Sequence, residues 1–285
     1  MSAVAVTGAA GAVGQRTLRQ LSSDSSVERL VAIDRRRIDS SNRGVEGRQL
    51  NLATAPVEKL TEALAGVSSL IHLAGHAPQR ADAASVAEIF SVTLEAAGAA
   101  DVDHVVLLSS GTVYGAYPDN PIPLTEAEPA RPNEALAFAV SKLELEQIAQ
   151  RWADADAKRS VALLRPTTTL SERGVSWVAK AMRAATTVRP DQADPPVQFL
   201  HHDDLAAALS FVTRRGLDGV FNVAPDGWIG PEEFRELVGG VRFRVPVAVN
   251  DRLLEAGRRV GFRPTPEGIE PYVRNSWVLA NDRLR

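Results

Sequence analysis

The stretch ALAFAVSKLELEQ, from Ala135 to Gln147, has the pattern of a helix and carries Lys142 one turn after Phe138. Residues four apart on a helix share a face, so the amine and the ring are predicted to point into the same space. A lysine there is either a solvated surface charge or a group that holds a ligand or tunes the acidity of a neighbour. Its neighbour is a phenyl ring, which has no proton to give.

A run of glycines supplies a second candidate site. VAVTGAAGAVGQRTL places Gly8, Gly11 and Gly14 between a predicted strand and a predicted helix. Glycines allow a sharp turn and let backbone N–H groups approach a pyrophosphate at the helix amino terminus, where the helix dipole favours anions. Ala12 and Val13 belong to the same predicted loop. A strand, these glycines and a helix in that order predict dinucleotide binding.

The second predicted strand ends at Asp34, twenty residues beyond Gly14. A carboxylate there accepts both ribose hydroxyls of an adenosine and repels a 2′-phosphate. The following Arg35, Arg36 and Arg37 argue the other way, because guanidinium groups bind phosphate. We favour NAD over NADP as the cofactor.

The remaining predicted cofactor contacts lie near the ends of two other predicted strands. They are Asn51, Leu52, Leu73, Ala74 and Gly75. Asn51, which closes the third strand region, is placed to hydrogen-bond the adenine. A role in a turn fits Asn51 equally well.

Composition bounds the class of protein. The chain has 285 residues, 45% hydrophobic and 24% charged, which is ordinary for a soluble globular protein. Its formal net charge of −3 gives no reason to expect a nucleic-acid or membrane partner. It has no cysteine, which excludes disulfides, thiolate metal sites and a cysteine nucleophile. With no apolar run of about 18 residues and no basic leader before the first apolar run, we expect a cytoplasmic protein.

Short apolar runs alternate with segments of helical spacing along the first half of the chain. The runs are AVAV, RLVAID, SSLIHLAG, HVVLLSS and SVALLRP. This alternation predicts an α/β fold, a doubly wound parallel sheet of the Rossmann type. After Arg165 the rhythm changes and a Pro-rich loop follows. We therefore expect a dinucleotide-binding core over 1–165 and a smaller α/β substrate lobe over 166–285, closely packed because no flexible linker separates them.

Five motifs carry a resemblance to a known family. TGAAGAVG, LIHLAG, LLSSGTVYG, SKLELE and LLRPTTTL occur in the order and spacing of the extended short-chain dehydrogenases/reductases, the NAD-dependent epimerase/dehydratase family. The chain resembles this family from about Ala3 to Val223. The resemblance implies NAD as cofactor, a sugar nucleotide or small alcohol as substrate, and a possible homodimer that pairs through helices including Ala135–Gln150.

The resemblance also assigns catalytic roles. In the family, a Tyr four residues before a Lys moves a proton on or off a substrate hydroxyl while hydride passes to the nicotinamide; the Lys holds the nicotinamide ribose and lowers the Tyr pKa. Here Lys142 matches the Lys, Ser110 matches the helping Ser or Thr, and Phe138 stands in place of the Tyr. The usual Asn is missing too, because none lies between His72 and Leu94. General acid–base catalysis is worth ~10² to 10⁴ in rate, so we expect the standard alcohol oxidation to be crippled.

Other residues on loops after predicted strands are candidates for a substitute acid. They are Ser110, Thr112, Tyr114, Tyr117 and His76. We take Ser110 as a hydrogen-bond donor to a substrate oxygen. Tyr114 is the candidate acid, with a structural ring at the loop base as the alternative.

The segment HHDDLAAAL looks like a metal cluster but is interpreted as a helix start. Its polar residues are His201, His202, Asp203 and Asp204. Adjacent residues at a helix start do not converge on one point, and Asp203 is typical of an N-cap. We predict no metal site. Arg165 is expected to anchor a loop.

Three functions stay open from the sequence. The favoured one is an NAD-dependent oxidoreductase of the epimerase/dehydratase type whose altered mechanism lacks the usual tyrosine. The alternatives are an NAD-scaffolded non-redox lyase or cyclase, and a non-catalytic NAD-binding sensor or partner-binding protein. Nothing in the sequence names a substrate.

Overall fold

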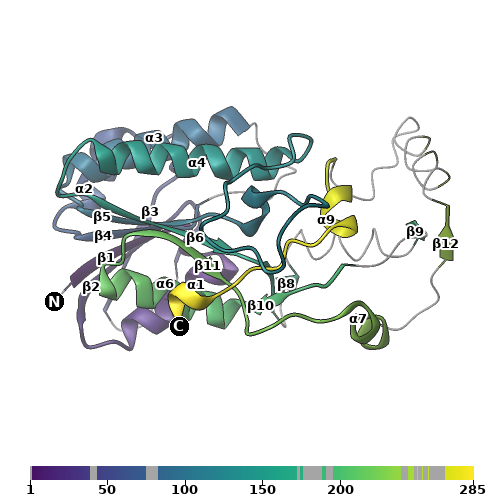
Figure 1. Ribbon diagram of the computed structural model, residues 1–285. Coiled ribbons are helices and arrows are strands. Elements are labelled where there is room, and N and C mark those ends of the chain that lie inside the picture. The colour runs from purple at the N-terminus through teal and green to yellow at the C-terminus, as the bar shows by residue number, and fades with distance from the viewer. Residues whose placement is uncertain are drawn as a thin grey trace.

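Figure 1 shows a computed structural model of the chain. It describes residues 2–38, 44–74, 83–171, 174–175, 188–190, 195–238, 243–246, 249, 252, 256 and 267–285.

A seven-stranded parallel sheet forms the centre of the molecule, in the order β11-β6-β5-β4-β1-β2-β3. Its strands are β1 (Ser2–Thr7), β2 (Val27–Asp34), β3 (Val45–Gln49), β4 (Ser69–His72), β5 (His104–Leu108), β6 (Ser160–Pro166) and β11 (Gly219–Val223). The strand order reverses between β1 and β4, and such sheets bind ligands outside the carboxyl ends of the strands at that point. The predicted doubly wound fold is confirmed.

Helices cover both faces of the sheet (Figure 1). One face carries α2 (Val57–Leu64), α3 (Ala83–Ala99) and α4 (Ala137–Asp154), and the other carries α1 (Ala12–Ser22) and α6 (His202–Arg215). The alternation along β5 explains both layers: Val105 and Leu107 belong to the core cluster under α2, α3 and α4, whereas Val106 belongs to the cluster under α1 and α6. Successive side chains of a strand point to opposite faces, so a run of apolar residues serves two helical layers.

Smaller elements lie beyond the core, at the right of Figure 1. β7 (Thr168–Ser171), β8 (Gly174–Val175) and β10 (Phe199–His201) form a three-stranded sheet, and β9 (Val188–Pro190) pairs with β12 (Phe243–Val245). The helices there are α7 (Pro231–Val238) and α9 (Glu270–Arg274). Two short 3-10 helices lie against the central sheet: η1 (Gly111–Tyr114) contacts β6, and η2 (Asp282–Leu284) contacts β11. A third apolar cluster, which includes Tyr114, Leu136 and Tyr272, joins η1 and α4 to the C-terminal segment.

Two elements that follow residue 166 return to the core. β11 pairs in parallel with β6, with Val223 opposite Pro166, and α6 packs on α1. Arg16 of α1 forms a salt bridge of 2.7 Å with Asp203 of α6. The sequence division at 165 placed both elements in the smaller lobe, whereas the structure places them in the sheet and its covering layer.

The start of α6 also differs from the expectation. The N-cap is His201, whose Nδ1 accepts the backbone N–H of Asp203 at 3.2 Å. The prediction that Asp203 caps the helix was therefore wrong. Asp203 lies in the first turn, where a carboxylate still interacts favourably with the helix dipole.

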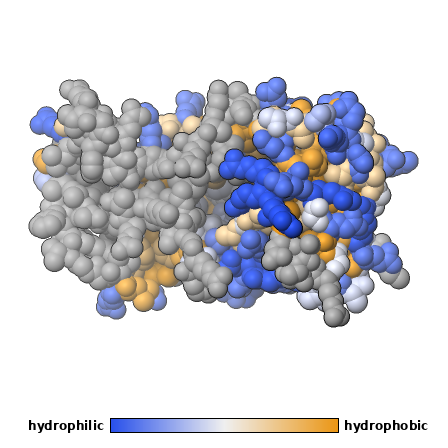
Figure 2. All heavy atoms as spheres, turned by 180° about the vertical axis from the view of Figure 1, so that it is seen from behind, coloured by the Kyte–Doolittle hydropathy of each residue, from blue (hydrophilic) through white to orange (hydrophobic). Residues whose placement is uncertain are grey.

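Seen from behind, the part of the surface that is not grey carries mainly hydrophilic side chains, with smaller hydrophobic areas between them (Figure 2). Within the described ranges of the chain, no helix has the length and apolar character needed to cross a membrane.

Candidate functional site

The glycine loop is pressed against the end of β4. Gly8 has φ +70°, and a Cβ on it would lie 2.8 Å from the backbone N of Ala74. A Cβ on Gly14 would lie 2.7 Å from the carbonyl oxygen of Ala9. Both positions therefore require glycine, one for its left-handed backbone and both for lack of space. No side chain caps α1 at Gly11, which leaves the first N–H groups of the helix for an anionic ligand.

Asp34 closes β2 beside this loop and is buried. Its Oδ2 accepts the backbone N–H of Ala10 at 3.0 Å, and its Oδ1 accepts the backbone N–H of Arg36 at 2.9 Å. Burial by itself would raise the pKa of Asp34, but the hydrogen bonds from Arg36 and Ala10 and the Arg36 charge outweigh it and lower the pKa. Asp34 is thus an ionised acceptor at the edge of the glycine loop.

The other predicted cofactor contacts differ in their burial and in what they touch. Leu52 and Leu73 are partly buried and pack on the core clusters of opposite sheet faces. Asn51 accepts the backbone N–H of Ala53 with its side chain at 3.2 Å, which favours the turn role left open by the sequence. Arg35 is exposed. Gly75 and the candidate acid His76 lie outside the described residues.

Lys142 lies on α4 and reaches back to the sheet. Its Nζ donates a hydrogen bond to the carbonyl oxygen of Leu108, the last residue of β5, at 2.8 Å, and lies 5.8 Å from the centroid of the Phe138 ring. The side chain is half-buried. Burial lowers the pKa of Lys142 to about 8, although the charge of Glu146 one turn later opposes the shift. Lys142 is therefore not the solvated surface lysine that the sequence also allowed.

Ser110 follows the same strand and is brought to the same end of β5 as the Lys142 amine. Its Oγ accepts the backbone N–H of Thr112 at 3.2 Å and lies 2.9 Å from the Thr112 hydroxyl, so it caps η1. From the C-terminal segment, the Tyr272 hydroxyl donates to the Thr112 carbonyl at 2.7 Å. Hydrogen bonds at both the N–H and the carbonyl oxygen of Thr112 therefore fix the turn that carries Ser110.

Tyr114 is enclosed by the protein, with 1% of its surface exposed. Its hydroxyl donates to Oδ1 of Asn222 at 2.8 Å, and the Arg165 guanidinium lies 4.6 Å from its ring centroid. Burial raises the pKa of Tyr114, with Arg165 opposing the shift. These contacts favour the structural ring over the substitute acid.

A buried ion pair lies next to this ring. Arg165 donates from Nε and Nη2 to the two carboxylate oxygens of Glu146, at 3.0 and 2.6 Å, and both side chains are almost fully buried. The Ser109 hydroxyl also donates to Glu146. The sequence led us to expect that Arg165 anchors a loop, and it did not single out Glu146. The available signal was its spacing, because Phe138, Lys142 and Glu146 follow one another at intervals of four on α4.

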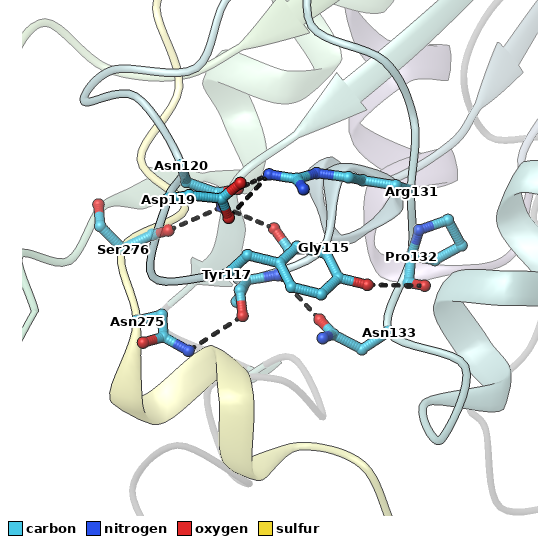
Figure 3. Close-up of polar contacts among 10 residues, drawn as sticks. Gly115, Tyr117, Asp119, Asn120, Arg131, Pro132, Asn133, Asn275 and Ser276 are labelled. Atoms are coloured by element: carbon cyan, nitrogen blue, oxygen red, sulfur yellow. Dashed lines mark hydrogen bonds and ion pairs between the residues drawn. The ribbon is translucent and has the colours of Figure 1, made fainter.

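Tyr117, another residue considered as an acid, belongs to the loop between η1 and α4 (Figure 3). The Arg131 guanidinium lies 4.5 Å from its ring centroid. Its hydroxyl points toward the carbonyl oxygen of Pro132 at 3.4 Å, which is a weak contact.

The same loop is tied to the C-terminal segment (Figure 3). Asn120 donates from its side chain to the carbonyl oxygens of Gly115 and Ser276, each at 3.0 Å. Asn275 donates to the carbonyl oxygen of Ala116 at 3.1 Å. The last residues of the chain thus stabilise the loop that leads into α4 and Lys142.

His72 ends β4, where the strand order reverses. Its Nδ1 lies 3.0 Å from the Thr7 hydroxyl, and its ring packs on Phe90 with centroids 4.6 Å apart. Burial lowers the pKa of His72 to about 3, helped by the positive charge of Lys142 and opposed by a hydrogen bond with the backbone of Ala74. The imidazole is therefore neutral in the folded protein at neutral pH.

A doubly wound sheet, a glycine loop that admits no Cβ and a carboxylate at the end of β2 define a dinucleotide-binding protein of the Rossmann class. The family model "NAD dependent epimerase/dehydratase family" matches residues 4–224. The chain belongs to this family.

Among curated proteins, the chain is 32% identical over 170 residues to an L-arabinose 1-dehydrogenase (NAD(P)(+)) of Haloferax volcanii. The match covers 54% of this chain and 62% of that protein, so it spans less than two thirds of the relative's length.

Two solved structures illustrate the likeness of the fold. MoeE5, in complex with UDP-glucuronic acid and NAD, has a TM-score of 0.65 and 24% identity, with 86% of this chain and 85% of that chain covered. The UDP-glucose 4-epimerase of Thermus thermophilus, in complex with NAD, has a TM-score of 0.70 and 19% identity, with 99% and 91% covered.

Proposed function

We propose that this protein binds NAD and is an oxidoreductase of the epimerase/dehydratase type that acts on a sugar nucleotide or small alcohol without a catalytic tyrosine. The observation that carries the proposal is the glycine loop beside Asp34. Gly8 and Gly14 let the loop pack so closely on neighbouring backbone that neither position has room for a Cβ, and the carboxylate next to them is buried and ionised. Backbone N–H donors at the start of α1 suit a pyrophosphate, and a carboxylate acceptor suits the hydroxyls of an adenosine ribose.

The chain offers a holding group for the pyrophosphate and for each ribose of the cofactor. The first N–H groups of α1 would hold the pyrophosphate, Asp34 the hydroxyls of the adenosine ribose, and Lys142 those of the nicotinamide ribose. When bound, NAD supplies the acceptor or donor of a hydride. Every other role in the reaction falls to side chains of this protein.

Lys142 is the group that we assign to proton transfer. Phe138 has no proton to exchange, and the Tyr114 hydroxyl is buried against Asn222. The Lys142 amine shares one side of α4 with the Phe138 ring, and its pKa of about 8 places both protonation states within the physiological range. The neutral amine accepts the proton of a substrate hydroxyl during oxidation, and the ammonium returns it during reduction.

Ser110 is assigned to hold the substrate oxygen. Its Oγ accepts the N–H of Thr112, which leaves its own proton to donate to that oxygen. The choice of a sugar nucleotide or small alcohol follows the family membership and the relatives: one acts on arabinose, and the structural neighbours hold UDP-sugars.

The test begins with titration calorimetry of the purified protein with NAD⁺. Cofactor reduction is then followed by absorbance of the reduced nicotinamide against a panel of pentoses, hexoses and UDP-sugars, at pH values on both sides of 8. We expect NAD⁺ to bind, and oxidation to rise with pH through about 8 as Lys142 loses its proton. The rise should vanish in Lys142→Met. A wild-type protein that does not bind NAD⁺ would falsify the proposal.

A second candidate function is a non-catalytic NAD-binding sensor. It is favoured by the Phe138 ring, which packs in the third apolar cluster and gives the Lys142 amine no phenol to act on. NAD⁺ binding without turnover of any substrate in the panel supports this candidate against the first.

A further inference from the structure

The C-terminal segment carries a tyrosine that reaches the turn of Ser110. Tyr272 lies in α9 and is fully buried in the third apolar cluster. Its hydroxyl donates to the carbonyl oxygen of Thr112 at 2.7 Å. The family model ends at residue 224, so Tyr272 lies outside the part of the chain that the family match covers.

Thr112 connects this hydroxyl to the group that is proposed to hold the substrate. The backbone N of Thr112 lies 3.2 Å and its hydroxyl oxygen 2.9 Å from the Ser110 Oγ. The Thr112 carbonyl oxygen has two lone pairs, and it accepts the backbone N–H of Gly115 at 3.0 Å as well as the Tyr272 hydroxyl. The Gly115 bond closes the turn on itself, whereas the Tyr272 bond fixes the turn to a distant part of the chain.

Tyr272 is itself held in place. Its ring meets that of Trp277 edge-on with the centroids 5.6 Å apart, and the Trp277 indole N–H donates to the Tyr272 carbonyl at 3.1 Å. Burial raises the pKa of Tyr272, opposed by a hydrogen bond from the backbone of Asn133, so the hydroxyl stays protonated and remains a donor. Farther along the segment, Leu279 and Gln198 exchange hydrogen bonds of 2.7 and 3.0 Å, which tie the segment to the residue before β10. The Tyr272 hydroxyl is thus a fixed point against which the Ser110 turn is set.

We propose that Tyr272 is a positioning residue for the proposed reaction: by holding the Thr112 carbonyl, its hydroxyl fixes the turn from which Ser110 donates to the substrate oxygen. The inference rests on the proposed function, in which Ser110 holds that oxygen. A donor to an oxygen on which charge develops must be aimed at the position that the oxygen takes in the transition state, and a small displacement slows the reaction strongly. Loss of the Tyr272 hydroxyl therefore lowers the rate of the chemical step and leaves the groups that hold the cofactor in place.

Tyr272→Phe removes the hydroxyl and keeps the ring. Steady-state kinetics with NAD⁺ and the most active substrate of the panel measure the effect. We expect kcat to fall about tenfold, KM to change less than about threefold, and the affinity for NAD⁺ in calorimetry to stay within about twofold of wild type. Tyr117→Phe is the matched control, because it removes a hydroxyl whose contact with the Pro132 carbonyl is weak at 3.4 Å. It should behave as wild type does.

A double-mutant cycle with Ser110→Ala separates positioning from a general loss of structure. Ser110→Ala should lower kcat by about 10² or more, the scale of a lost donor to a developing oxyanion. If Tyr272 acts through Ser110, the double variant Tyr272→Phe/Ser110→Ala should be no slower than Ser110→Ala, because the positioned hydroxyl is already absent. Thermal unfolding shows that every variant is folded at the assay temperature.

Hydrogen exchange gives a readout that needs no turnover. The backbone N–H groups of Thr112 and Gly115 should exchange faster in Tyr272→Phe than in wild type, because the turn has lost its external support. Tyr117→Phe should leave both rates unchanged. Equal rates in Tyr272→Phe and wild type would mean that the hydroxyl does not hold the turn, and would overturn the inference.

The kinetic outcomes separate this inference from the proposed function. A wild type that turns over substrate, with a Tyr272→Phe variant that matches it in kcat, overturns the inference alone. Losses that multiply in the double variant also overturn it, because Tyr272 would then affect the reaction independently of Ser110. A wild type that binds NAD⁺ but reduces it with no substrate overturns the proposed reaction and this inference together.

Discussion

The Nζ of Lys142 lies 5.8 Å from the centre of the Phe138 ring and donates a hydrogen bond to the Leu108 carbonyl at 2.8 Å. In the family motif the ring is a tyrosine, whose hydroxyl this lysine activates. Here the amine is fixed by the end of β5, and the ring beside it supplies volume without a proton. In the proposed function, cofactor holding and proton transfer therefore both fall on one side chain.

Replacing Lys142 by Met should weaken NAD⁺ binding by about 1–3 kcal/mol, the range for a hydrogen bond that involves a charged group. Met keeps most of the apolar stem, so packing against the Phe138 ring survives. Calorimetry measures the effect. Lys59→Met, the same change at an exposed position of α2, is the control and should bind as wild type does. Unchanged affinity in Lys142→Met would mean that the amine does not reach the cofactor.

Local sequence patterns were enough to predict the core of the fold. Each of the five apolar runs became a strand, because two-sided burial leaves a continuous run in the sequence. The glycine loop was equally readable, since the backbone of Gly8 and the space around Gly14 allow one residue type.

Contacts between distant segments were not readable. Tyr114 bonds Asn222, 108 residues away, so the sequence could not say whether its hydroxyl was free. Glu146 meets Arg165 across the α4–β6 connection, 19 residues apart, and neither residue shows its partner locally. The sequence also did not predict that β11 joins the central sheet, because strand pairing depends on the whole topology and not on a local period.

The buried pair of Glu146 and Arg165 yields a stability prediction. Glu146→Ala leaves the guanidinium buried without its counter-charge and should lower the free energy of unfolding by about 3–5 kcal/mol. The double variant Glu146→Leu/Arg165→Met removes both charges and should recover much of that loss. Urea unfolding measures both.

The control for this pair is exposed. Asp119 and Arg131 are 3.1 Å apart at the surface, and Asp119→Ala should cost at most about 1 kcal/mol. If Glu146→Ala costs no more than Asp119→Ala, water reaches Arg165 and the pair is not buried in solution.

Because His72 is buried as a neutral imidazole, we expect the stability of the fold to fall in acid. Its pKa is about 3 in the folded protein and near the ordinary 6.5 when unfolded. Between these values the unfolded chain binds a proton that the folded protein refuses, so stability falls as pH drops below 6.5, by up to about 1.4 kcal/mol per pH unit. Above 6.5 both states are neutral and the contribution is flat.

Urea unfolding of wild type and His72→Asn, from neutral pH down to well below the ordinary histidine pKa, measures this slope. Asn keeps a polar atom for the Thr7 hydroxyl and does not titrate. As pH falls, the wild type should lose more free energy of unfolding than His72→Asn does. Parallel curves would contradict the burial of a neutral imidazole.

Phe138→Tyr tests what the missing hydroxyl does. The ring volume is nearly conserved, so packing should tolerate the change at a cost under ~1.5 kcal/mol. The new phenol would lie beside the Lys142 ammonium, which favours the ionised phenol and lowers its pKa. We expect NAD-dependent oxidation of a sugar nucleotide or alcohol to increase about tenfold or more over wild type, part of the ~10² to 10⁴ that general acid–base catalysis supplies.

The measurement is a cofactor-reduction screen of both proteins against one substrate panel, with the double variant Phe138→Tyr/Lys142→Met as control. The gain should disappear in the double variant, because the phenol then has no ammonium to lower its pKa. A wild type that outperforms Phe138→Tyr would mean that the phenyl ring belongs to a working mechanism in which Lys142 alone moves the proton. If both proteins bind NAD⁺ but neither reduces it with any substrate, the result would favour the non-catalytic sensor. The absent Asn between His72 and Leu94 would then limit turnover even where Phe138→Tyr restores the hydroxyl.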